Sequence, residues 1–162
     1  MSITSTQNIT PFLWFDGEAE EAMNLYTSIF PNSKITMVKK WGQGGPMPAD
    51  KIMAGTIVID GLNVNLFDAG PKFKFNESVS FFVSCKTQDE IDRYWKKLTE
   101  NGGEESMCGW LKDKFGFSWQ IVPSFVTEKM AHGDPARTGK MFQALLSMRK
   151  LDIAALEKAY NS

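Results

Sequence analysis

Apolar residues in the first half of the chain follow two different periods. Residues 9–15 form a nearly continuous apolar run, which is typical of a strand buried on both faces. After a break at Asp16-Gly17, apolar residues recur at i, i+3, i+4, i+7 and i+8, the spacing of one helix face. This stripe consists of Ala22, Leu25, Tyr26, Ile29 and Phe30. Strand-like runs follow at residues 34–41, 53–59 and 62–67, so the predicted order is β-α-β-β-β.

The second half repeats this order. A strand-like run at residues 78–84 precedes Thr87-x-x-Glu90, a capping box in which each side chain satisfies a free amide at a helix start. The helix stripe is Ile91, Tyr94, Trp95 and Leu98, and Asn101-Gly102-Gly103 supplies the left-handed stop. Two or three short strands are expected between residues 105 and 123.

The two halves align at an offset of 69 residues. The aligned positions are Phe12 with Phe81, Ala22 with Ile91, and Leu25-Tyr26 with Tyr94-Trp95. Because a strand, a break and a helix stripe coincide at one offset, we predict a duplication, with module one at residues 9–70 and module two at residues 76–123.

A helical tail is expected at residues 124–162. Asp134 caps a helix that has Pro135 at its first position, and a last short helix covers about residues 153–160. The apolar stripe of the tail is Met141, Phe142, Leu145 and Leu146. This stripe must cover either the sheet or a partner subunit.

Composition narrows the function classes. The chain has 162 residues, of which 43% are hydrophobic. Its formal net charge is -1, so it lacks the excess of positive charge that binding of nucleic acid requires. Residues 1–7 lack the apolar core of a signal peptide, and no run approaches a membrane span. We therefore expect a soluble, cytoplasmic protein. Cys85 and Cys108 are expected to be reduced and buried, with a single disulfide as the alternative.

Paired β-α-β-β-β modules resemble the vicinal-oxygen-chelate superfamily, which includes glyoxalase I, extradiol dioxygenases and bleomycin-resistance proteins. More narrowly, nearly the whole chain resembles the PhnB-like branch, whose members often carry the label 3-demethylubiquinone 3-methyltransferase. The matching pieces are residues 9–15, Glu21-Ala22, Tyr26, residues 67–69 and residues 151–156. The resemblance implies an α+β fold, a single glyoxalase-like domain over residues 1–162, and a homodimer.

The methyltransferase label has a physical requirement. Binding of S-adenosylmethionine normally needs a strand, a Gly-rich turn and a helix in Rossmann order. The Gly-rich stretch at residues 42–48 contains two prolines and opens no helix, so we interpret it as a flexible surface flap and discount the methyltransferase chemistry. Whether the flap closes over a ligand stays open.

In this superfamily the sheets curl, and their concave faces form a cup for the ligand. Strand alternation, together with the offset of 69, predicts which side chains face the cup. These residues are Pro11, Phe15, Asn63, Asn65, Phe67, Ser78, Ser80, Phe82 and Gln120, with Trp41 and Trp110 placed to close the mouth. The amides and hydroxyls need a ligand, water or one another as partners, unless this face is simply solvated.

Metal enzymes of the superfamily draw two His and two Glu from such inward positions. The counterparts in this chain are Pro11, Asn65, Ser78 or Ser80, and Gln120, which are poor ligands for a transition metal. The sole histidine, His132, lies outside the duplicated strands and is expected in a solvated loop. We therefore predict neither a metal site nor a cofactor.

Three function classes remain. The first is metal-independent binding of a small, neutral, partly aromatic molecule, with Phe or Trp for stacking and amides for orientation. The second is an enzyme of the same superfamily, such as a lyase, a dioxygenase or the labelled methyltransferase, acting on a quinone-like or dicarbonyl substrate. The third is an interaction module with a vestigial cup. Only Asp68 is an acid near the rim, and Ser118 lacks an accompanying His, so no catalytic residue can be assigned.

Overall fold

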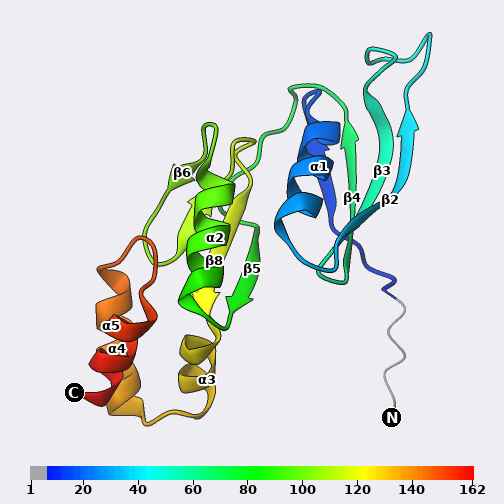
Figure 1. Cartoon of the computed structure of the whole chain (residues 1–162). Coiled ribbons are helices and arrows are strands. Elements are labelled where there is room, and N and C mark those ends of the chain that lie inside the picture. Colours follow the sequence, from blue (N-terminus) through cyan, green and yellow to red (C-terminus); the bar gives the residue numbers. More distant parts are fainter. Residues whose placement is uncertain (1–6) are drawn as a thin grey trace. The chain divides into compact units, whose positions relative to one another are not determined.

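A computed structural model describes residues 7–162, and the chain divides into two compact units, Met1–Lys74 and Phe75–Ser162 (Figure 1). The boundary falls between the two predicted modules. The prediction that no signal peptide is present concerns residues 1–7 and so lies almost wholly outside the described residues. None of the helices in the described part of the chain has the length and apolar content needed to cross a membrane.

The first unit has the predicted β-α-β-β-β order. Its elements are β1 (Phe12–Phe15), α1 (Ala19–Ile29), β2 (Lys34–Lys40), β3 (Ile52–Ile59) and β4 (Leu62–Asp68). The four strands form one sheet in the order β1-β4-β3-β2, in which β1 is parallel to β4 and the other pairs are antiparallel. The first strand is shorter than predicted, since Pro11 and the residues before it precede β1.

The core of the first unit lies between α1 and one face of this sheet. The predicted helix stripe is confirmed at Ala22 and Tyr26, both fully buried, and at Ile29. From the sheet, Ile57 on β3 and Leu66 on β4 are fully buried as well. Burying such side chains supplies roughly 1.5–3 kcal/mol each, which holds the helix on the sheet.

The second unit begins with the same order. Its first elements are β5 (Ser80–Cys85), α2 (Gln88–Thr99), β6 (Glu104–Glu105), β7 (Trp110–Lys112) and β8 (Ser118–Pro123). The sheet order is β5-β8-β7-β6, with β5 parallel to β8. The described chain is thus an α+β fold, as predicted, and it contains two four-stranded mixed sheets and five helices.

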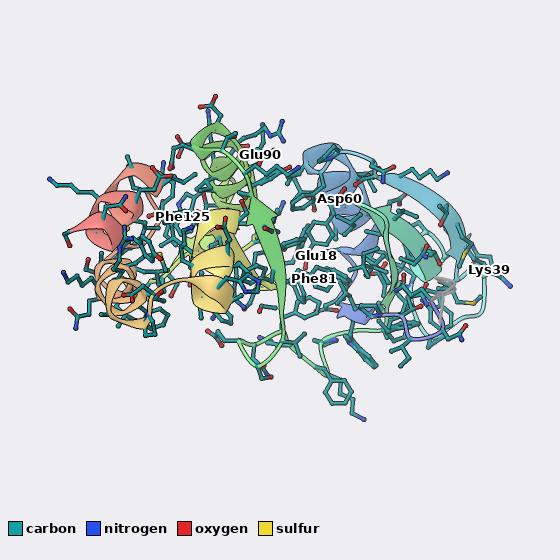
Figure 2. The ribbon with its side chains drawn as sticks, turned by 90° about the horizontal axis from the view of Figure 1, so that it is seen from below. Glu18, Lys39, Asp60, Phe81, Glu90 and Phe125 are labelled. Atoms are coloured by element: carbon teal, nitrogen blue, oxygen red, sulfur yellow. The ribbon has the colours of Figure 1, made fainter. Side chains whose placement is uncertain are left out.

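The entry to α2 follows the predicted capping pattern. The Thr87 hydroxyl accepts a hydrogen bond from the amide of Glu90 at 3.2 Å. Glu90, labelled in Figure 2, accepts in turn from the amide of Lys86 at 2.6 Å. These two bonds satisfy amides that have no partner within the helix, which fixes where α2 begins.

The tail consists of α3 (Ser124–His132), α4 (Pro135–Leu146) and α5 (Ile153–Asn161). The helix α3 was not predicted, and the expectation of a loop at His132 is wrong, because His132 is the exposed last residue of that helix. In Figure 2, the labelled Phe125 belongs to α3, and its ring meets that of Tyr160 on α5 at 5.8 Å.

The tail packs on the sheet of the second unit. Part of the predicted apolar stripe therefore covers this sheet rather than a partner subunit. Met141 and Leu145 of α4 are buried in one cluster with Val122 of β8. The Gln88 side chain at the start of α2 bonds the Leu151 carbonyl at 3.1 Å and the Ile153 amide at 2.9 Å. Both cysteines are free, and Cys108 is half-buried rather than buried.

Candidate functional site

Each sheet has one face covered by its helix and one open face, and the open face is the predicted cup surface. In β4, Val64 and Leu66 are fully buried, whereas Asn63, Asn65 and Phe67 alternate with them and are partly exposed. The predicted alternation in β4 is therefore confirmed. The neighbouring Thr56 of β3 lies opposite Asn65 and shares the open face.

The prediction for β1 is wrong by one residue. Leu13 and Phe15 are 5% and 2% exposed, and Leu13 lies beside the buried Leu66 under α1. Phe15 therefore faces the helix and not the cup. Pro11 precedes β1, where its carbonyl accepts the Asn65 amide at 2.9 Å, and alternation assigns its side chain to the face of Leu13.

The error arises from carrying the helix offset over to the strands. The helices α1 and α2 begin at Ala19 and Gln88, an offset of 69, but β1 and β5 end at Phe15 and Cys85, an offset of 70. The connection from strand to helix is one residue shorter in the second unit. A one-residue shift moves every side chain of a strand to the other face.

Aromatic side chains line the open face of the first sheet where β1 meets β4. The Phe67 ring lies 4.8 Å from that of Phe12 and 4.9 Å from that of Trp14, and Phe73 lies 4.9 Å from Trp14. All three contacts are edge-to-face, the favoured arrangement for such pairs. Phe12 and Phe73 are 58% and 57% exposed, so the cluster leaves aromatic surface uncovered on this face. If β1 had been assigned the correct alternation, the sequence would have placed Phe12 and Trp14 on the open face.

The predicted amides of the first sheet already have protein partners. Thr56 Oγ1 donates to Asn65 Oδ1 at 2.8 Å. The Asn63 side chain donates from Nδ2 to Gln7 Oε1 at 3.2 Å, and the Asn63 backbone amide and carbonyl also bond to the Gln7 side chain, each at 2.9 Å. The sequence left a ligand, water or one another as partners for the predicted polar residues, but Asn65 and Asn63 bond to Thr56 and Gln7, which the prediction did not include.

Trp41 follows β2 and is fastened to the end of β4. Its indole Nε1 donates to the Asp68 carbonyl at 2.9 Å, and its amide donates to the Lys51 carbonyl at 2.9 Å. The loop that follows joins two antiparallel strands, β2 and β3, and opens no helix, as predicted.

In the second unit the strand parity was predicted correctly. Trp119 and Ile121 are buried under α2, while Ser80 and Phe82 lie opposite Ser118 and Gln120 on the open face. Gln120 Nε2 donates to Ser80 Oγ at 2.8 Å, and Trp110 lies beside Gln120 on β7. Ser78, by contrast, precedes β5, is exposed, and bonds to Asn76.

A pocket of about 380 Å³ lies at the β7 side of this open face. Ser118, Lys112 and Trp110 line it, together with the loop residues Met107 and Cys108. Ser118 is 0% exposed, and its hydroxyl has no hydrogen-bond partner among the described residues. A buried hydroxyl without a partner costs roughly 1–3 kcal/mol, so this group is the part of the pocket that most needs a ligand.

Lys112 lies next to Ser118 in the sheet and forms an ion pair with Glu77. The hydrogen bond from Lys112 lowers the pKa of Glu77 below its ordinary value, and the same bond raises the pKa of Lys112. Both side chains are therefore charged at neutral pH. Sequence reasoning missed this pair, although alternation from Trp110 would have placed Lys112 on the open face.

Asp68, predicted as an acid near the rim, has a structural role. It is 1% exposed, and its two carboxylate oxygens accept the amides of Ala19 at 2.9 Å and Ile52 at 2.8 Å. These bonds join β4 to the first residue of α1 and to the start of β3. The carboxylate consequently lies on the helix side of the sheet and does not serve the open face.

The residues present do not fit the metal that this fold holds in other proteins. Asn65 and Gln120 are neutral amides engaged with Thr56 and Ser80, and the Pro11 side chain has no donor atom. Transition metals favour imidazole, thiolate and carboxylate ligands. Within residues 7–162, no three His, Cys, Asp or Glu side chains are close enough together to hold a metal ion.

Two mixed sheets, each backed by one helix and open on the other face, define a protein of the vicinal-oxygen-chelate class. Residues 7–122 match the model of the 3-demethylubiquinone-9 3-methyltransferase family, and because this match spans most of the chain, the protein belongs to that family. No curated protein matches the sequence.

Solved structures agree with this assignment. A PhnB protein from Bacillus cereus, described as a 3-demethylubiquinone-9 3-methyltransferase, is 35% identical over 73% of this chain and all (100%) of its own, with a TM-score of 0.69. A Pseudomonas aeruginosa protein is 24% identical over 71% of this chain and 96% of its own, with a TM-score of 0.60. The fosfomycin resistance protein FosX from Mesorhizobium loti is 12% identical over 81% of this chain and 100% of its own, with a TM-score of 0.57. The last two show the fold alone.

The family description names a methyltransferase, but the described residues do not supply the usual site for its cofactor. A doubly wound parallel sheet with a Gly-rich turn before a helix holds a nucleotide cofactor in the Rossmann manner. Each sheet of this chain has a single parallel pair, and the Gly-rich loop lies between antiparallel strands.

Proposed function

We propose that this chain binds a small, partly aromatic molecule without a metal ion, on the open face of the second sheet. The observation that carries the proposal is the Ser118 hydroxyl, which is fully buried, has no hydrogen-bond partner within residues 7–162, and lies on the wall of a pocket of about 380 Å³. Small-molecule sites usually combine apolar walls with a few convergent polar groups. Trp110 and Met107 supply the apolar part of this wall.

The sequence predicts that the ligand is neutral, because its predicted partners were amides and hydroxyls. Asn65 and Gln120 bond to neighbouring side chains in the structure, so they would have to exchange those bonds for a ligand. Ser118 requires no such exchange, which favours it as the group that orients the ligand. A neutral ligand would meet it through a carbonyl or hydroxyl group.

Native mass spectrometry of the purified protein, paired with elemental analysis, tests this function. We expect no stoichiometric transition metal, and an organic adduct that the Ser118→Val variant loses because its methyl groups fill the hydroxyl's place. A matched change at an exposed serine, Ser28→Val on α1, should leave the adduct in place. A stoichiometric metal would contradict the proposal and support the enzyme reading of the same fold.

We also propose that the chain forms a homodimer through its helical tail. Met130 of α3 and Phe142 and Leu146 of α4 are 59%, 40% and 53% exposed, although they are large apolar residues. Exposed apolar surface of this kind is common where a protein meets a partner. A second copy of the chain is the partner that the resemblance to the superfamily implies.

A further inference from the structure

The pocket beside Ser118 carries more negative than positive charge. Glu77, Glu104 and Glu105 line it, and Lys112 is the single cationic side chain among its lining residues. Glu77 forms the ion pair with Lys112, and Glu104 lies opposite Lys112 in the β6–β7 register. One ammonium group is thus shared between two carboxylates, and the excess charge favours a second cation nearby.

The other walls suit the same kind of ligand. Glu105 does not add to this charge, because it lies opposite the buried Leu111 and accepts the indole Nε1 of Trp95 on α2 at 2.7 Å, which places its carboxylate on the helix side of the sheet. Trp110 adds an aromatic surface, and tryptophan is the side chain whose ring attracts a cation most strongly. The Ser118 hydroxyl can accept a hydrogen bond from an ammonium group, because no group in the described part of the chain bonds to it.

We propose that the ligand carries a protonated amine on an apolar or aromatic body, with the amine directed to Ser118 and Glu104 and the body against Trp110 and Met107. This inference rests on the proposed function and changes the ligand from the neutral molecule that the sequence predicts to a cationic one. The inference does not depend on the acidic residues alone, since the buried Ser118 hydroxyl is an independent indication that this pocket binds a ligand.

Three probes of nearly equal size separate charge from shape: 2-phenylethylamine, 2-phenylethanol and 3-phenylpropanoate. We would titrate each into the isotopically labelled full chain and follow the amide of Ser118 and the indole resonance of Trp110 by NMR. The amine should bind about threefold or more tighter than the alcohol, and the acid weakest, as expected for partly exposed charge pairs. Added salt should weaken binding of the amine and leave binding of the alcohol unchanged.

Two variants locate the effect. Glu104→Gln removes one carboxylate of the pocket, and it should bring the affinity of the amine close to that of the alcohol. Glu100→Gln is the matched control, because Glu100 pairs with Lys97 at the end of α2 and does not line the pocket. This control should retain the preference for the amine.

The outcomes are distinct for the two proposals. If none of the three probes moves the Ser118 and Trp110 resonances, the proposed small-molecule site is wrong. If the alcohol or the acid binds as tightly as the amine to the unmodified protein, the site stands and the cationic ligand is wrong. This comparison needs no variant, so poor folding of Glu104→Gln would not leave the inference undecided.

Discussion

Two buried aspartates show how single residues fix this fold. Asp68 joins β4 to α1 and β3 through two backbone amides. Asp113 is 2% exposed and accepts the amides of Phe115 and Phe117 and the indole Nε1 of Trp119, all at 2.9–3.0 Å. It thereby holds the turn that precedes β8. A carboxylate accepts without donating, so it suits positions where several amides converge.

Replacing Asp68 by asparagine tests this role. The amide group would direct a donor at the Ala19 or Ile52 amide, so we expect a loss of roughly 1–3 kcal/mol in the free energy of unfolding. The control is Asp60→Asn at the exposed β3–β4 turn (Asp60 is labelled in Figure 2), where φ is 44° and asparagine is well tolerated. Chemical denaturation gives the free energy of unfolding of both variants. If Asp68→Asn were as stable as Asp60→Asn, a structural role for Asp68 would be contradicted.

Cys85 makes stability depend on pH. It is 0% exposed, and burial raises the pKa of its thiol from 9.0 to about 12. Because the folded state holds this proton more tightly, the contribution is complete below pH 9.0 and is lost as pH rises toward 12. We expect the unfolding free energy of the native chain to fall, relative to that of Cys85→Ala, as the pH rises from 9.0 toward about 12. A constant difference between the two proteins would contradict this assignment.

At the scale of elements, the two modules have the same order of strands and helix, but their helices align at an offset of 69 residues and their first strands at an offset of 70. The start of α2 is fixed by the Thr87 cap, whereas Glu18 makes no such bond before α1, where the Ala19 amide donates to Asp68 instead. The connection from strand to helix is one residue shorter in the second module. Sequence periodicity identified both elements correctly and still assigned Phe15 to the wrong face. The aromatic cluster around Phe67 was missed for the same reason, since Phe12 and Trp14 occupy the face given to Phe15.

A matched pair of substitutions tests the face assignment in β1. Phe15→Ala should cost roughly 3–5 kcal/mol of stability because the ring is buried under α1. Phe12→Ala should cost at most about 1.5 kcal/mol, the value of its exposed contact with Phe67. Thermal or chemical unfolding gives both values. A larger loss at Phe12 than at Phe15 would show that the strand has the opposite parity.

At the scale of the whole molecule, the tail decides how much of the second sheet stays open. Val122 lies on the side of Ser118 and Gln120, yet it is only 6% exposed because Val126, Met141 and Leu145 cover it. The open face therefore ends at Gln120, and the pocket lies toward β7. The tail has a second, exposed apolar side that its own unit does not cover.

Light scattering coupled to gel filtration tests the proposed dimer. The unmodified chain should have twice the mass of the 18.2 kDa monomer. Replacing both Phe142 and Leu146 by serine should shift it to the monomer, because these side chains would form the interface. Ile9→Ser, at a 90% exposed residue before β1, is the control and should remain dimeric. A dimer that survives the double substitution would place the interface elsewhere.

The sequence by itself determined the types and order of the elements in the two modules, because hydrophobic periodicity and capping are local properties of the chain, but it did not reveal α3. It also determined the faces of β4, β5 and β8 by alternation. Tertiary structure decided which face Phe15 occupies and that Asn65 and Gln120 bond to Thr56 and Ser80. It also decided that the Ser118 hydroxyl is buried beside Lys112 and has no hydrogen-bond partner among the residues that the structure describes. Those facts depend on the lengths of connections and on contacts between residues far apart in sequence, which no local pattern records.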